Sequence, residues 1–335
     1  MSDDVRLMLG ENLLGHAEQV LGPGLVRPLL AIGELAAEQR LESFLIGGAV
    51  RDLLLGERSD DIDVMVTGDA IAFTKLLSAR WPTLLADLSE PTKPVSFPKY
   101  GTAKLSFESE LAPGVSSLDF ASARKEVYPG SGVPPLVSFP ASVEEDLGRR
   151  DFSVNSMALS LSPRRPFALF DPFNGREAIA RRELSVLHEG SFVDDPARIL
   201  RGLRFASRFG FSFAPSTERL LSAALSEGML QRLPPFRLFD EMRKAAAERD
   251  PGPTFGLFAE RQILSQFHPE ALKPQMSVDR AALAGAEAWM FWMVSLFPTL
   301  ESAAFEAVLK EFGVQPVLRK RLAQVRHEVF STRGR

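Results

Sequence analysis

The chain has 335 residues, of which 45% are hydrophobic and 24% charged, and its formal net charge is −4. This length is long for one hydrophobic core, so we expect two or more domains. The absence of cysteine, of an apolar run of eighteen residues and of a basic leader followed by an apolar stretch argues against a disulfide framework, a membrane partner and secretion, and the cytoplasm is the expected compartment.

The charge is divided unevenly along the chain. Residues 1–150 contain 14 Lys and Arg against 22 Asp and Glu, whereas residues 151–335 contain 25 against 21. An acidic first half and a basic second half predict that the two parts meet different ligands.

Helices and short strands are predicted to alternate in the first half. Apolar residues at helical spacing over 17–42 predict a helix, and the run FLIGGAV that follows predicts a buried strand. VRDLLLG predicts a short helix, DIDVMV a strand and DAIAFTKLLSARW another helix. Three more strands are expected in GTAKLSF, VSSLDFASAR and SVNSMALSLS, with the loop YPGSGVPPLVSFP between the last two.

The second half has helical patterns throughout. The fold class we predict is therefore α/β followed by all-α: a small mixed sheet with interleaved helices, then helices alone. The expected domains cover residues 1–170, 171–250 and 251–335.

Asp61 and Asp63 stand one residue apart in a predicted strand. Alternate side chains of a strand share a face, so both carboxylates point the same way while Ile62 points into the core. Two carboxylates this close repel each other unless a cation lies between them, and oxygen-only ligands favour Mg²⁺. Asp119, in another predicted strand, is a candidate third ligand. The alternative is that the pair is a solvated strand end or a cap for the next helix.

Gly47 and Gly48 end the preceding strand and begin a helix. A glycine turn here lets backbone N–H groups approach a phosphate. A phosphate-binding turn, a helix and a strand with paired carboxylates together predict a site for a nucleoside triphosphate and its Mg²⁺.

Four motifs occur in the order typical of one family. GGAVRDLLLG with DDIDV, EEDLGRRDFSVNSMAL, DPFNG and SFVDDPARILRGLRFASRFGF resemble the signature motifs of class II tRNA nucleotidyltransferases and poly(A) polymerases. The resemblance covers about residues 40–245. It implies a polymerase-β-like head, followed by an elongated helical neck, body and tail, with Asp61 and Asp63 as the catalytic metal ligands.

The resemblance also implies which residues contact the sugar and phosphates of the incoming nucleotide. Besides the glycine pair, they are Arg51, Arg149, Arg150, Asp151 and Asn155. The alternative for the two adjacent arginines is a solvated charge run.

The family's base-reading motif, E-D-x-x-R, aligns with Asp194, Asp195 and Arg198. The first position departs from the pattern, which leaves the role of Asp194 open. Cytosine and adenine present an amino donor beside a ring-nitrogen acceptor, whereas uracil and guanine present a carbonyl beside a ring N–H. A carboxylate that accepts from the amine and a guanidinium that donates to the ring nitrogen would therefore select C and A.

Arginines recur on one side of the same helix. Arg201 and Arg204 are assigned to the nucleotide, and Arg208 lies further along, where tRNA backbone is a plausible partner. The alternative is a solvated helix face.

The predicted function is template-independent addition of CMP or AMP to the 3′ end of tRNA, with CTP and ATP as substrates. Within the family, a CC-adding enzyme or a poly(A) polymerase is the alternative, and the loop over 123–139 disfavours a CC-only enzyme. A non-catalytic RNA-binding protein and a nucleotidyltransferase that modifies a protein or a small molecule are the alternatives from other classes. The sequence leaves the oligomeric state open.

Overall fold

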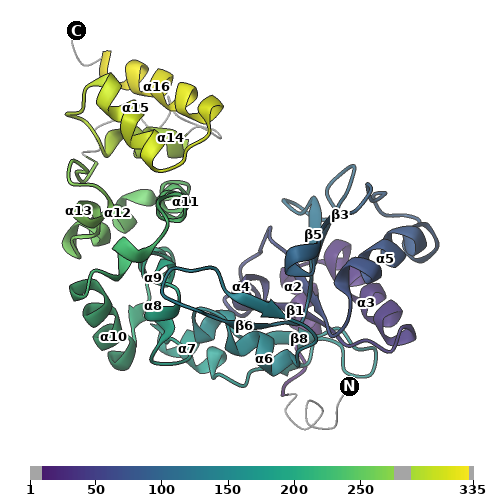
Figure 1. Cartoon of the computed structure of the whole chain (residues 1–335). Helices are drawn as coiled ribbons and strands as arrows, with labels where there is room; N and C mark the ends of the chain where they lie inside the picture. Colours follow the sequence, from purple (N-terminus) through teal and green to yellow (C-terminus); the bar gives the residue numbers. More distant parts are fainter. Residues whose placement is uncertain (1–9, 275–287, 332–335) are drawn as a thin grey trace. The chain divides into compact units, whose positions relative to one another are not determined.

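The computed structural model describes residues 10–274 and 288–331. Contacts divide these residues into two compact units (Figure 1). The first, which we call the sheet unit, runs to Val127 and again over Pro135–Leu187. The second, the helical unit, comprises Tyr128–Pro134 and the described residues from His188 onward.

One mixed sheet of seven strands organises the sheet unit, in the spatial order β3-β4-β5-β2-β1-β8-β9. Strands β2 and β5 are parallel, and the other neighbours are antiparallel. The predicted small mixed sheet is confirmed. The strands are β1 (Ser43–Ile46), β2 (Asp63–Val66), β3 (Val95–Phe97), β4 (Thr102–Ser106), β5 (Ser117–Ser122), β8 (Ala158–Ser160) and β9 (Leu169–Phe170).

Helices cover both faces of this sheet. They are α2 (Leu14–Val20), α3 (Pro23–Glu38), α4 (Gly48–Leu54), α5 (Ala70–Leu84), α6 (Val143–Gly148) and α7 (Gly175–Arg181), with 3-10 turns η1 (Pro98–Tyr100) and η2 (Ser153–Asn155). Because side chains alternate along a strand, Leu45 of β1 joins one core with α3 and α5, whereas Phe44 and Ile46 join another with α6. The sheet is thus buried on both faces around β1.

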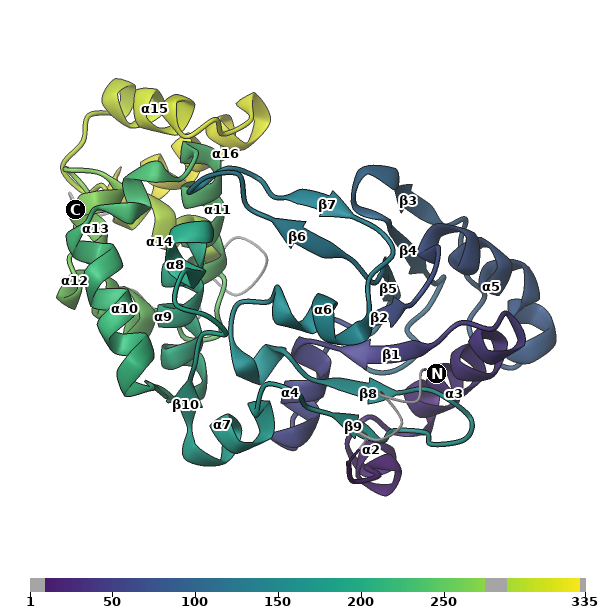
Figure 2. The same cartoon turned by 60° about the horizontal axis from the view of Figure 1, so that its bottom comes forward.

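A separate hairpin is formed by β6 (Lys125–Val127) and β7 (Leu136–Ser138), which pair antiparallel (Figure 2). Residues Tyr128–Pro134, which lie between these two strands, belong to the helical unit. The predicted loop therefore contains a short strand at its end.

The helical unit confirms the predicted helical second half. Its helices are α8 (Ser191–Asp194), α9 (Ala197–Phe209), α10 (Pro215–Ser226), η3 (Met229–Arg232), α11 (Pro235–Ala246), α12 (Pro251–Glu260), α13 (Ile263–Phe267), α14 (Ala288–Ser295), α15 (Ser302–Glu311) and α16 (Pro316–Ser331). Two further short strands are β10 (Glu183–Leu184), in the sheet unit, and β11 (Ser212–Phe213). Within the described residues, no helix is both long and apolar enough to cross a membrane.

Two local predictions need correction. Asp61 precedes strand β2, which begins at Asp63, because the partner strand β1 ends at Ile46, the residue paired with Asp63. Beyond Ile46 the chain turns at Gly47, so the β1–β2 ladder ends there, while the Ile62 carbonyl still accepts from the Asp119 amide of β5. The helix predicted over 17–42 is two helices, because Gly22 takes a positive φ of 77° between them.

Candidate functional site

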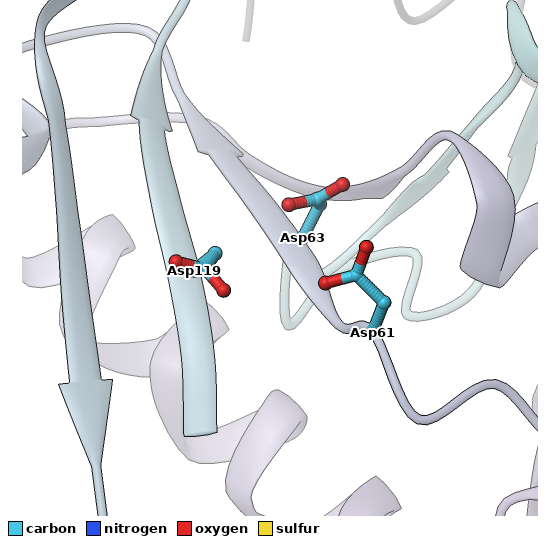
Figure 3. Close-up of side chains that lie close together, drawn as sticks. All are labelled: Asp61, Asp63 and Asp119. Carbon is cyan, nitrogen blue, oxygen red and sulfur yellow. The ribbon is translucent and has the colours of Figure 1, made fainter. Parts of the chain in front are cut away.

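Three carboxylates converge where strand β2 begins alongside its parallel neighbour β5. Asp63 is the first residue of β2 and pairs in register with Asp119 of β5, while Asp61 lies two residues earlier. Ile62 between the two aspartates is buried, and its carbonyl accepts a 2.9 Å hydrogen bond from the Asp119 amide. One oxygen from each carboxylate lies within 4.8 Å of the others (Figure 3). The structure thus brings together all three residues that the sequence predicted as metal ligands.

The ionised forms of Asp61 and Asp63 are disfavoured. Burial raises the pKa of Asp63 to about 6, Asp61 adds to the rise, and Arg150 opposes it. Asp61 is exposed, but partial burial is still the largest cause that raises its pKa, followed by the charge of Asp119. Lys104 lowers the pKa of both Asp61 and Asp63. Carboxylates held together against their repulsion are ready to accept a cation.

The donor set fits a divalent metal ion. All three side chains offer carboxylate oxygens, which hard divalent cations prefer. Asp61 is exposed while Asp63 and Asp119 are half-buried, so the cluster is open to solvent on one side. Coordination positions that the protein does not fill would thus remain for water or substrate oxygens.

The turn at Gly47 lies next to both Arg150 and this cluster. The Gly47 φ of 69° is in the region that favours glycine, and a Cβ atom there would lie 2.8 Å from Nη1 of Arg150 and 3.8 Å from Oδ2 of Asp63. The turn between β1 and α4 is therefore in contact with both the guanidinium and the carboxylate. This is the turn that the sequence predicted to approach a phosphate.

Arg149 and Arg150 are fixed by one buried carboxylate. Arg149 donates to Oδ1 of Asp146 from Nε (3.0 Å) and Nη2 (2.8 Å), and Arg150 donates to Oδ2 from Nη2 (3.1 Å). Burial alone would raise the pKa of Asp146, but Arg150 and Arg149 bring it below its ordinary value. Arg149 also donates to Glu126 at 2.8 Å. With side chains only 15% exposed, the two arginines are not a solvated charge run.

Arg51, Asp151 and Asn155 form a buried network. Arg51 donates from Nε and Nη2 to Asp52 at 2.8 and 2.7 Å, and from Nη1 to Asn155 Oδ1 at 2.5 Å. Asn155 in turn donates to Asp151 at 2.9 Å. A Cβ atom at Gly48 would lie 3.3 Å from Arg51 Nη2. These predicted nucleotide-binding residues thus connect α4 to η2 through hydrogen bonds, next to the glycine turn.

The helical unit holds the predicted base-reading pair at the start of α9. Arg198 is 3% exposed and donates from Nη1 to Ser191 Oγ at 2.6 Å, while its Nη2 lies 3.5 Å from the Tyr128 hydroxyl. Its guanidinium carbon is 5.7 Å from the centre of the Tyr128 ring. Asp195 accepts from Arg237 Nη2 at 3.0 Å. Both side chains are held in place by neighbours within the same unit.

The other predicted residues of this helix region differ from one another. Asp194 is half-exposed and lies 3.8 Å from His188 Nε2. Arg201 lies over the Phe205 ring at 5.6 Å. Arg204 is 8% exposed and pairs with Glu248 at 2.8 Å, so its guanidinium is engaged inside the helical unit.

Sequence reasoning missed Lys104, Tyr128 and Arg237. Lys104 lies directly across from Asp119 in the β4–β5 ladder. Pairing the two predicted strands as a hairpin would have indicated this neighbour. Tyr128, which lies beside Arg198, and Arg237, which donates to Asp195, come from distant parts of the chain, and no local pattern indicates them.

Comparison with known proteins gives consistent matches. Residues 43–185 match the family model described as the poly(A) polymerase head domain. The A-adding tRNA nucleotidyltransferase of Aquifex aeolicus is 41% identical over 208 residues, which are 62% of this chain and 23% of that protein. The chain spans between about a quarter and about half of the length of the curated relatives that it matches first.

Solved structures match over most of the chain. An apo CCA-adding enzyme superposes with a TM-score of 0.77 at 27% identity, covering 95% of this chain and 74% of the other. A tRNA nucleotidyltransferase complexed with a primer tRNA and an incoming ATP analogue superposes with a TM-score of 0.70 at 30% identity, covering 90% and 85%.

Proposed function

The chain belongs to the tRNA nucleotidyltransferase and poly(A) polymerase family, and we propose that it adds nucleotides to the 3′ end of tRNA without a template. In this reaction the terminal 3′ hydroxyl of the tRNA loses its proton to solvent and its oxygen forms a bond to the α-phosphorus of the nucleotide, the bond from that phosphorus to the oxygen that bridges it to the β-phosphate breaks, and pyrophosphate leaves. The observation that carries the proposal is the cluster of Asp61, Asp63 and Asp119 beside the glycine turn.

We propose Mg²⁺ as the ion of this cluster. Asp61, Asp63 and Asp119 would hold it, and when bound it would supply a Lewis acid for the attacking hydroxyl and for the charge that develops on the α-phosphate. Burial is the first cause of the raised pKa of Asp63, but the charges of Asp61 and Asp119 add to it, and a bound cation would relieve this repulsion.

The triphosphate is assigned to the glycine turn and the paired arginines. Arg150 sits against Gly47 and next to Asp63, and Asp146 fixes both Arg149 and Arg150. Guanidinium groups that are already oriented bind phosphate oxygens with little further loss of side-chain freedom. The hydrogen bonds among Arg51, Asp151 and Asn155 link α4, which follows the glycine turn, to η2. We propose that these three residues help to position the nucleotide.

Base selection is assigned to Asp195 and Arg198. Arg198 is oriented by Ser191 and Tyr128, and Asp195 by Arg237, so the acceptor and the donor are held in fixed positions. This arrangement suits an amino-bearing base, as in ATP and CTP, and disfavours GTP and UTP. Asp194 and Arg201 are proposed as further contacts, and Arg204 as a residue that fixes the helix through Glu248.

Addition of AMP is the activity that we favour, and addition of CCA is the second candidate. The relative from Aquifex aeolicus is an A-adding enzyme, whereas the apo enzyme with the TM-score of 0.77 is CCA-adding. The cytoplasm is the proposed compartment for either reaction.

Three tRNA substrates separate these activities. Purified protein is incubated with Mg²⁺, labelled ATP or CTP, and tRNA that ends at the discriminator base, at C or at CC. An A-adding enzyme incorporates one AMP into the tRNA ending in CC and no CMP, whereas a CCA-adding enzyme extends all three. Incorporation of neither nucleotide into any of them would refute the proposal and favour a non-catalytic RNA-binding protein.

A further inference from the structure

Lys104 places a positive charge beside the carboxylate cluster, against Asp119. Its Nζ atom lies 2.7 Å from Oδ2 of Asp119 and 3.2 Å from Oγ of Ser117. Lys104 and Asp119 are directly opposite each other in the antiparallel β4–β5 ladder, so the backbone register fixes the pair. The contact is thus built into the sheet.

The ion pair is exchangeable. The Lys104 side chain is 41% exposed and that of Asp119 is 31% exposed. A lysine on a flexible stem at this exposure can leave its partner at small cost. Asp119 has a second oxygen, and one of its oxygens lies within 4.8 Å of oxygens of Asp61 and Asp63. The Asp119 carboxylate is therefore close both to the Lys104 ammonium group and to the site proposed for the divalent ion.

We propose that Lys104 is a built-in counter-ion that stands in for a divalent cation beside Asp119 in the metal-free protein and competes with that cation for the cluster. The proposal rests on the metal site of the proposed function and adds a residue outside its ligand set. Lys104 is a positioning residue here, since it acts through Asp119.

The competition has a defined sign. In the metal-free protein the ammonium group offsets the repulsion among three carboxylates, and it lowers the pKa of Asp61 and Asp63. Once the divalent ion is bound, the same positive charge repels it. Replacing Lys104 with methionine, which keeps most of the stem, should thus weaken the metal-free fold and strengthen metal binding. With nearly water-like screening of this exposed side chain, the repulsion between a unit charge and a divalent ion roughly 5–10 Å apart corresponds to about three- to thirtyfold in affinity.

Mn²⁺ is a suitable probe, because the electron paramagnetic resonance signal of the free ion measures binding without turnover. The full-length wild type and Lys104→Met are titrated with Mn²⁺ in the absence of nucleotide and tRNA. Lys125→Met is the matched control, since the Lys125–Glu145 pair also measures 2.7 Å, has side chains 49% and 44% exposed and lies in the same unit. We expect Lys104→Met to bind Mn²⁺ about three- to thirtyfold more tightly, and Lys125→Met to bind it like the wild type.

Unchanged or weaker Mn²⁺ binding by Lys104→Met, with normal binding by the wild type, would overturn the role of Lys104 and leave the metal site intact. If neither Lys104→Met nor the wild type binds Mn²⁺, both the role of Lys104 and the proposed metal site are overturned. Thermal unfolding gives a second readout: Lys104→Met should unfold at a lower temperature than the wild type in EDTA and gain more from added Mn²⁺. If the methionine variant does not fold, Lys104→Gln is used in both measurements.

Discussion

Asp63 is held where its ionised form is disfavoured. Burial and the neighbouring Asp61 raise its pKa to about 6, although Arg150 opposes the rise. In the unfolded chain the carboxyl titrates near its ordinary value of 3.8. The metal-free fold therefore binds a proton more readily than the unfolded chain, and a bound cation would replace that proton.

This difference predicts how stability depends on pH in EDTA. Between about pH 4 and pH 6 the folded protein binds more protons at Asp63 than the unfolded chain, so this residue makes the free energy of unfolding fall as pH rises through that range. Asp63→Asn should remove this contribution. Urea denaturation of both proteins at several pH values measures the difference, and an identical pH dependence in the two would contradict the assigned pKa.

Comparing alanine substitutions at Gly47 and Gly56 separates the effect of backbone strain from the effect of a clash with Arg150. Both have positive φ, 69° and 73°, but a Cβ atom at Gly56 meets open space, whereas one at Gly47 meets Arg150 at 2.8 Å. We expect Gly47→Ala and Gly56→Ala each to lose about 1–2 kcal/mol of folding stability through strain. Only Gly47→Ala should also weaken ATP binding, measured by calorimetry with Mg²⁺. Equal ATP affinity in the two variants would argue against a role of the turn in binding.

At the scale of elements, the segment from β1 to β2 was predictable because each part has a local signal. An apolar run, a glycine pair and a short helix ending at a glycine precede the strand that starts with Asp63. The short strands β3, β6, β7 and β9 were not predicted, because two or three residues are too few to show an alternating pattern. Their existence depends on partners elsewhere in the chain.

The hydrogen-bond network around Arg51 joins α4 to η2, so we expect its loss to destabilise the fold. Arg51→Met leaves the buried carboxylate of Asp52 without its partner, which costs about 3–5 kcal/mol of folding stability. Arg176→Met removes an ion pair with Glu11 whose side chains are 53% and 55% exposed, and should cost less than about 1 kcal/mol. Urea denaturation compares them. Similar losses in the two variants would show that the Arg51 network does not stabilise the fold.

At the scale of the whole molecule, the distribution of charge along the chain could be predicted from the sequence, whereas the long-range contacts of the site residues could not. The second half of the chain carries 25 Lys and Arg against 21 Asp and Glu, which favours a polyanionic partner. In contrast, two of the side chains that orient Arg198 and Asp195, those of Tyr128 and Arg237, lie far from them in sequence. The motif residues were thus predictable, and the side chains that hold them were not.

Binding of tRNA should depend steeply on salt. Contacts between basic side chains and phosphates release counter-ions, so the affinity should fall at least about tenfold between roughly 50 and 200 mM monovalent salt. Filter binding of labelled tRNA over this range measures the slope. An affinity that does not change with salt would contradict a phosphate-binding helical unit and favour a small-molecule or protein substrate.

The most direct test of the central claim is single-turnover transfer of AMP to tRNA ending in CC, with Asp60→Asn as the control for Asp61→Asn and Asp63→Asn. Asp60 is adjacent in sequence but is not part of the carboxylate cluster. We predict Mg²⁺-dependent transfer by the wild type and Asp60→Asn, and a rate at least about a hundredfold lower for the other two variants, which should remain folded. Transfer by Asp61→Asn and Asp63→Asn at the wild-type rate would contradict the account.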